Sequence, residues 1–214
     1  MRLAARLIFF SLLLHAALVA GAPWSGAALS ARRAALDVPG FALQVVATHN
    51  NQGLPFLVVD KVQATVWVFT ARGALLGNSA ALLGEAIGDD TVPGIGERKL
   101  ANVRPDERTT PAGRFASTLG RNLLGQEVLW VDYDSGVSLH RIIRGQRSER
   151  RAERLATPTP DDNRVSYGCI NVPAAFFNAL VVPTVRKNGT IVYVLPETRP
   201  MHQVFDFLSS GSVR

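Results

Sequence analysis

Residues 56 to 73 read FLVVDKVQATVWVFTARG, two runs rich in β-branched and aromatic side chains that end in an Ala-Arg-Gly turn. Such side chains favour extended backbone, so we expect adjacent strands at 56–61 and 65–70. The same pattern predicts further strands at 114–117, 127–133, 137–143 and 190–195. Glycine and proline punctuate residues 84–108 and favour loops there. The chain is therefore predicted to be mainly β, with one principal domain at 56–197.

One short helix is predicted after Ser166-Tyr167-Gly168-Cys169-Ile170-Asn171. Pro173 suits a first helical position, and residues 174–180 form an amphipathic run of about two turns. Cys169 is expected on the connection that enters this helix. Backbone N–H groups are free at such a point and can stabilise a thiolate or an oxyanion.

The N-terminus has the pattern of a secretory signal. Arg2 and Arg6 precede an apolar run over 7–22, which ends in a small-x-small cleavage pattern. We expect a signal peptide at 1–22, cut between 20 and 28, and an approach segment at 23–55. An uncleaved anchor is disfavoured because the run is shorter than the roughly 20 residues of a spanning helix and His15 interrupts it. The prediction is export to the periplasm or cell wall, with membrane contact only through the signal.

The chain is basic, with a formal net charge of +6 that becomes +4 when Arg2 and Arg6 leave with the signal. A positive charge suits an anionic partner, although solubility alone also accounts for it. No aromatic-interleaved basic pattern is present, so no nucleic-acid partner is expected. Residues 198–214 are predicted to be a C-terminal tail that docks through Val204, Phe205, Phe207 and Leu208.

Cys169 is the only cysteine of the chain. In an oxidising compartment it has no internal disulfide partner, which leaves two readings, a small buried apolar residue or a reactive thiol. A reactive thiol needs a base. His15 lies in the signal, His49 precedes the strands and His202 lies in the tail, so His140 is the candidate. The histidines and Cys169 lack zinc-ligand spacing, and we expect no metal or cofactor.

These residues resemble the L,D-transpeptidase (YkuD) catalytic domain of bacterial cell-wall enzymes. Ser166, Gly168, Cys169, Ile170 and Asn171 match the cysteine signature of that family, downstream of His140. Segments 58–61 and 110–115 are similar to two further family elements, so the resemblance spans about 56–195. It implies a β-sandwich of mixed strands with a short helix after the catalytic cysteine.

The resemblance also implies roles for single residues. Cys169 would be the nucleophile and His140 the general base and acid, while backbone N–H groups of Gly168 and Cys169, with that of Tyr167, would bind the oxyanion. A backbone carbonyl would orient His140. Bracing of the loop or contact with substrate is implied for Ser166, Asn171, Arg141 and Arg164.

The implied function is a cysteine-dependent L,D-transpeptidase that acts on peptidoglycan tetrapeptide stems through a thioester. With water as acceptor, the same site would make an L,D-carboxypeptidase. A non-catalytic wall-binding domain of the same fold is the other alternative. Three departures from the family motivate it: Tyr167 replaces a frequent histidine, Arg141 follows His140, and 29 positions separate His140 from Cys169.

This spacing implies an insertion at 141–164 that is rich in arginine. Charge runs are usually solvated faces. Arginine also pairs bidentately with carboxylates, and our hypothesis is that the insertion meets a peptide stem or an anionic wall polymer. Its arginines are Arg141, Arg144, Arg147, Arg150, Arg151, Arg154 and Arg164.

Overall fold

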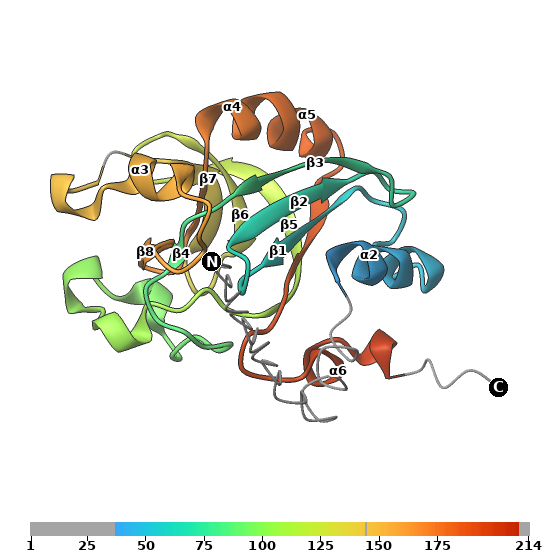
Figure 1. Cartoon of the computed structure of the whole chain (residues 1–214), viewed down its shortest axis with the longest axis horizontal. Coiled ribbons are helices and arrows are strands. Elements are labelled where there is room, and N and C mark those ends of the chain that lie inside the picture. The colour runs from blue at the N-terminus through green and yellow to red at the C-terminus, as the bar shows by residue number, and fades with distance from the viewer. Residues whose placement is uncertain (1–36, 144, 210–214) are drawn as a thin grey trace, which may run out of the picture. The chain divides into compact units, whose positions relative to one another are not determined.

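The computed structural model describes residues 37–143 and 145–209 (Figure 1). The predicted signal peptide, Arg144 and residues 210–214 lie outside the described residues. Strands in this part of the chain are β1 (Phe56–Asp60), β2 (Thr65–Phe69), β3 (Leu75–Ala80), β4 (Leu83–Gly84), β5 (Gly113–Arg121), β6 (Glu127–Asp132), β7 (Val137–Arg141), β8 (Arg164–Ser166), β9 (Ile170–Val172) and β10 (Thr190–Val194). The α-helices are α2 (Val38–Ala47), α3 (Arg151–Ala156), α4 (Ala174–Phe176), α5 (Val182–Val185) and α6 (Met201–Val204).

Within the described residues, eight strands form one mixed sheet in the order β3-β2-β1-β10-β5-β6-β7-β9, and β4 and β8 form a small parallel pair. The two edges of the large sheet approach each other, because Leu82, just after β3, exchanges both backbone hydrogen bonds with Asn171 of β9. The mainly β class is therefore confirmed. In place of two stacked sheets, the protein has one sheet that curls until its edges are bridged.

Each strand predicted from β-branched runs is present, within a few residues. The sequence did not predict β3, β4, β8 and β9. β3 reads Leu-Leu-Gly-Asn-Ser-Ala and owes its extended form to pairing with β2. Three residues suffice for β9 because it pairs in parallel with β7. Tertiary pairing thus decides where strand propensity is weak.

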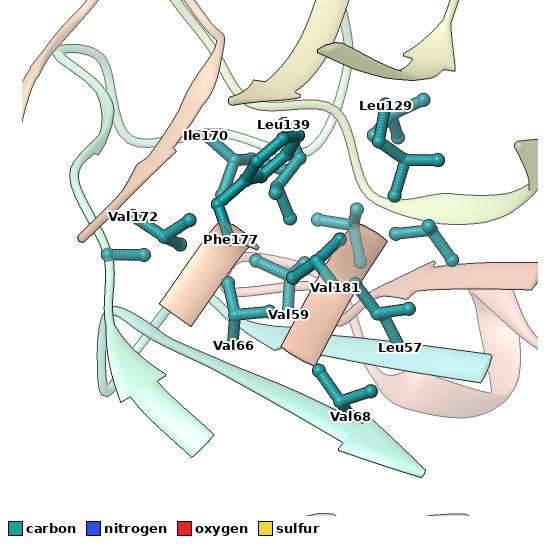
Figure 2. Close-up of a cluster of buried hydrophobic side chains, with 14 of the residues drawn as sticks. Leu57, Val59, Val66, Val68, Leu129, Leu139, Ile170, Val172, Phe177 and Val181 are labelled. Atoms are coloured by element: carbon teal, nitrogen blue, oxygen red, sulfur yellow. The ribbon is translucent and has the colours of Figure 1, made fainter. Parts of the chain in front are cut away.

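Alternate residues of β1 enter two separate cores. Leu57 and Val59 belong to the larger core, where Phe177 and Val181 fill the space under the helical segment after β9 (Figure 2). Phe56 and Val58 face the opposite side and contact α2. Figure 1 shows α4 and α5 on one side of β1–β3 and α2 on the other.

The second core contains parts of the chain that the sequence analysis placed outside the domain. α2, within the expected approach segment, buries Val38, Phe41 and Val45. Asp37 caps this helix, since its carboxylate accepts from Gly40 N–H at 2.8 Å. Phe205, from the expected tail, is buried in the same core. Residues 37–55 and 198–208 therefore belong to the folded unit.

The predicted helix after Cys169 is present and begins where expected, after Pro173, but it runs further than residue 180. Helical backbone runs from α4 through a π-helical turn, η5 (Phe177–Val181), into α5. Pro183 in α5 lacks the N–H that would bond the Ala179 carbonyl, which accounts for the widened turn. β9 separates Cys169 from this helix. Cys169 therefore precedes the helix as expected, but the connection between them contains a strand.

Candidate active site

Cys169 lies in the loop between β8 and β9, and its side chain is half-buried. The parallel register of β7 and β9 sets Leu139 beside Ile170 and His140 beside Asn171. Ser138 of β7 holds its Oγ 3.7 Å from Cys169 Sγ. The sheet thus places His140 on β7 and Cys169 just before the neighbouring strand β9. Most of the residues between them form the insertion that connects β7 to β8.

His140 is oriented by the backbone of the residue that follows it. Its Nδ1 donates to the Arg141 carbonyl at 2.7 Å. Because a carbonyl oxygen can only accept, the proton of the neutral ring lies on Nδ1, and Nε2 carries the free lone pair. The arrangement therefore provides a base of fixed tautomer.

Cys169 Sγ lies within 3.7 Å of both Ser138 Oγ and the Gly136 carbonyl oxygen. The Cys169 thiol and the His140 ring also shift each other's protonation. Burial raises the pKa of the Cys169 thiol, but the hydrogen bond and charge of His140, aided by Ser138, lower that pKa below its ordinary value. Burial lowers the pKa of His140, but its contact with Cys169 and with the Arg141 carbonyl raises that pKa above its ordinary value. Both net shifts favour a thiolate–imidazolium pair.

The thiol loop, residues 166–171, is held by the buried Ser166 hydroxyl. This oxygen accepts from Gly168 N–H at 3.1 Å and donates to the Cys169 carbonyl at 2.6 Å. Gly168 has φ +119°, and a Cβ there would lie 2.8 Å from the Thr109 carbonyl oxygen, so only glycine fits. The Gly168 N–H was expected to bind an oxyanion, but it is already engaged with Ser166.

Two other N–H groups of the thiol loop remain as oxyanion donors. Those of Tyr167 and Cys169 make no hydrogen bond to any residue that the structure describes. The Tyr167 ring is exposed, and the Arg108 guanidinium lies over it at 4.0 Å from its centroid. Arg108 in turn pairs with Glu85 at 2.6 Å. Tyr167 can thus contribute to the site through its backbone while its ring contacts Arg108.

Asn171 connects the thiol loop to the arginine-rich insertion. Its side chain is fully buried, and its Oδ1 accepts from Arg151 Nη1 at 2.8 Å. Its Nδ2 donates to the Cys169 carbonyl at 3.4 Å and lies 3.5 Å from His140 Nε2. Arg151 is only 7% exposed and also pairs with Glu149 at 2.8 Å. These contacts favour bracing as the role of Asn171.

Arg141 and Arg164 also make internal contacts. Arg141 donates to Asn178 Oδ1 at 2.7 Å and to the Glu127 carbonyl at 3.0 Å. Arg164 pairs with Glu197 and donates to the Lys61 carbonyl at 2.8 Å. Of the two roles considered for these arginines, the contacts favour bracing.

Most arginines of the insertion have acidic or carbonyl partners. Arg150 pairs with Glu153, and Arg154 donates to the Glu149 and Asp162 carbonyls. Arg147 is exposed, and its side chain makes no ion pair or hydrogen bond within residues 37–143 and 145–209. The hypothesis of an anionic partner therefore depends mainly on Arg147, and it stays a prediction.

A cavity of about 360 Å³ opens beside His140. Val128, Glu127, Ile142 and Ile143 contribute to its lining. A second cavity, of about 440 Å³, shares Ile142 and Ile143 with the first and is bordered by Arg147. A peptide that enters the first cavity would thus meet His140 close to the arginine-rich insertion.

A buried charge cluster is linked to the thiol loop. Lys61 Nζ lies 2.8 Å from Asp89 Oδ1 and 3.4 Å from Glu197 Oε1, and it donates to the Thr110 carbonyl at 3.0 Å. Burial raises the pKa of the Asp89 carboxyl, but hydrogen bonds from Lys61, Thr198 and nearby backbone hold that pKa well below its usual range. The family resemblance in the sequence included the segments that contain Lys61 and Thr110, but it gave neither residue a role.

No helix in the described part of the chain is both long and apolar enough to cross a membrane. Nor do residues 37–143 and 145–209 gather three or more His, Cys, Asp or Glu side chains in a group that could hold a metal ion.

No family model and no curated protein sequence matches the chain. Solved structures do match it. They are L,D-transpeptidases and a cell-shape protein. The catalytic domain of the E. faecium L,D-transpeptidase is 20% identical, with 66% of this chain and 96% of that chain covered and a TM-score of 0.37.

Two further matches come from longer chains. The L,D-transpeptidase from Mycobacterium smegmatis is 17% identical, with 65% of this chain and 58% of that chain covered and a TM-score of 0.36. The helical cell shape determining protein Pgp2 from Campylobacter jejuni is 15% identical, with 69% and 49% covered and a TM-score of 0.44. The chain thus spans about half the length of these longer proteins. Several L,D-transpeptidase catalytic domains match its structure at low sequence identity.

Proposed function

We propose that this protein is a cysteine-dependent L,D-transpeptidase that crosslinks or remodels peptidoglycan outside the cytoplasm. The observation that carries the proposal is the placement of an oriented His140 on β7, next to the strand that follows Cys169. The lowered pKa of the thiol and the raised pKa of the imidazole agree with this placement. A cysteine kept only for its apolar bulk needs no oriented histidine beside it. The matching cysteine signature in the sequence supports this reaction class.

The reaction would proceed through a thioester. The Cys169 thiolate attacks the carbonyl carbon of the L-residue in a donor tetrapeptide stem, and Tyr167 and Cys169 N–H groups stabilise the resulting oxyanion. The C–N bond to the D-residue breaks as the His140 imidazolium gives its proton to the leaving amine. An acceptor amine then attacks the thioester, loses a proton to His140 and releases the thiolate.

Water can replace the acceptor amine, and the protein would then be an L,D-carboxypeptidase. Both reactions share the same acyl-enzyme and differ only in the group that attacks it. The cavity beside His140 is the route by which either acceptor would arrive. Access to this cavity therefore decides between crosslinking and trimming.

The test is incubation of the purified protein with a disaccharide-tetrapeptide, followed by mass spectrometry. We expect a crosslinked dimer that has lost one terminal D-residue, and we expect no product from the Cys169→Ala variant. Loss of the D-residue without a dimer would identify a carboxypeptidase. An unchanged substrate would contradict enzymatic function and favour a wall-binding domain, and turnover by Cys169→Ala would rule out the thioester.

A further inference from the structure

Thr110 lies beside the thiol loop, and its buried hydroxyl both accepts and donates a hydrogen bond. Thr110 Oγ1 accepts from Gly84 N–H at 2.9 Å and donates to the Gly168 carbonyl at 2.8 Å. The side chain is fully buried, so no water competes for these bonds. The hydroxyl hydrogen therefore has one direction, toward the Gly168 carbonyl.

The Gly168 carbonyl belongs to the same peptide unit as the Cys169 N–H. A trans peptide is planar, and its C=O and N–H point in opposite directions. When Thr110 fixes the carbonyl on one side, it also fixes the direction of the Cys169 N–H on the other. A hydrogen bond to the carbonyl polarises the amide and strengthens the N–H as a donor.

The other candidate donor is held in the same manner. The Tyr167 N–H shares its peptide unit with the Ser166 carbonyl, which accepts from Glu85 N–H at 2.9 Å. Glu85 thus holds one peptide unit directly, and Gly84 of β4 holds the other through Thr110. Both unpaired N–H groups of the thiol loop are therefore oriented from the carbonyl side.

The support of Thr110 is itself rigid. Its backbone carbonyl accepts from Lys61 Nζ at 3.0 Å, and Lys61 is fixed by Asp89 in the buried charge cluster. The backbone next to Thr110 also touches the thiol loop, since a Cβ on Gly168 would lie 2.8 Å from the Thr109 carbonyl oxygen. A small displacement of Thr110 would thus be transmitted to Gly168.

We propose that Thr110 is a positioning residue for acyl transfer, because its hydroxyl aims the Cys169 N–H at the oxyanion. The proposal rests on the proposed function only in that Cys169 attacks a carbonyl. It adds that the donor geometry is set from outside the thiol loop, by the segment that begins at Thr110.

Two electrophiles separate this role from general support of the fold. p-Nitrophenyl acetate acylates Cys169 through a tetrahedral oxyanion with release of p-nitrophenolate, whereas iodoacetamide alkylates the same thiolate by displacement of iodide without an oxyanion. Complete removal of one oxyanion donor lowers the rate of the chemical step by about 10²–10³-fold. For Thr110→Val, which keeps the shape and misaligns the donor, we expect acylation to fall by about 10- to 100-fold.

Alkylation of Thr110→Val should keep its rate within about twofold and its pH profile, because His140 and the thiol are untouched. Thr110→Ser, which keeps the hydroxyl, should acylate close to the wild-type rate. Thr190→Val is the matched control. Thr190 lies on β10, it is also buried, and its hydroxyl donates to the Pro55 carbonyl at 2.7 Å. This variant should leave the ratio of the two rates unchanged.

Equal loss of both rates in Thr110→Val, wild-type acylation by that variant, or a selective loss in Thr190→Val would overturn the proposal. So would a wild-type protein that is alkylated but not acylated. If Thr110→Val does not fold, Thr110→Ala takes its place, and failure of both to fold would assign the hydroxyl to the fold alone. A wild-type protein that reacts with the ester but leaves peptidoglycan unchanged would instead contradict the proposed function.

Discussion

The thiol loop and the arginine segment, residues 147–154, meet at the hydrogen bond between Arg151 and Asn171, but they are held by different forces. The thiol loop is fixed by buried neutral groups, the hydroxyls of Ser166 and Thr110. The arginine segment is held by charged side chains, and one of its ion pairs, Arg150–Glu153, lies at the surface with side chains that are 70% and 62% exposed. Surface pairs are weak and screened by salt, whereas buried hydrogen bonds are not. Added salt should therefore loosen the arginine segment but leave the positions of the Tyr167 and Cys169 N–H groups unchanged.

Removal of the lysine from the charge cluster should have the largest effect on stability. In Lys61→Met, the buried Asp89 carboxylate loses its closest cation, and Thr110 loses a donor. Breaking such a buried pair costs about 3–5 kcal/mol. Urea denaturation should show this loss in the free energy of unfolding.

A double variant, Lys61→Met with Asp89→Asn, is the control for the uncompensated charge. It should recover part of the lost stability, because no bare carboxylate remains. A loss below about 1 kcal/mol in the single variant would mean that the charge cluster does not support the thiol loop.

Arg151 is the one arginine of the segment that reaches the thiol loop, and its removal should have an intermediate effect. Arg151→Met leaves Asn171 Oδ1 and Glu149 without their partner, at a cost of about 1.5–3 kcal/mol. The positive charge of Arg151 lowers the pKa of His140, so its removal should raise that pKa further.

NMR titration of the His140 ring measures this shift, and denaturation measures the stability. Arg150→Met is the matched control, since Arg150 lies in an exposed pair and should change stability by less than about 1 kcal/mol. Equal effects of the two variants would show that the bond between Arg151 and Asn171 is unimportant.

Arg147→Ala should have the smallest effect on the protein itself. Its exposed side chain makes no internal contact in the described residues, so stability should change by less than about 0.5 kcal/mol. If this residue meets an anionic wall polymer, retention on isolated peptidoglycan should fall, and so should the salt dependence of that retention. Unchanged retention would remove the last support for the arginine hypothesis.

Much of the sheet could be predicted because β1, β2, β6 and β10 carry their own β-branched signal. α2 was missed because Pro39 and Gly40 look like helix breakers, although proline fits a helix start that Asp37 caps. The apolar run around Phe205 predicted docking of the tail, but not its partner α2, which lies far away in the sequence. Such contacts leave no local pattern.

At the site, the sequence singled out Cys169 and His140 by chemistry, as a lone thiol and the one plausible base. It did not predict that the Gly168 N–H bonds to Ser166, because this depends on backbone direction in a tight turn. It also treated Arg151 as one of a solvated run, whereas the residue is buried against Asn171. Residue types singled out the two candidate side chains, and tertiary contacts decide which groups support them.

The pH dependence of Cys169 alkylation tests the central claim most directly. The lowered thiol pKa means that the thiolate forms at lower pH, so the iodoacetamide rate should rise with a midpoint below the ordinary value of about 8.5. In His140→Ala, the same midpoint should move up toward or above about 8.5, because burial then opposes only the contribution of Ser138. A wild-type midpoint at or above the ordinary value, unmoved by His140→Ala, would contradict the thiolate–imidazolium pair.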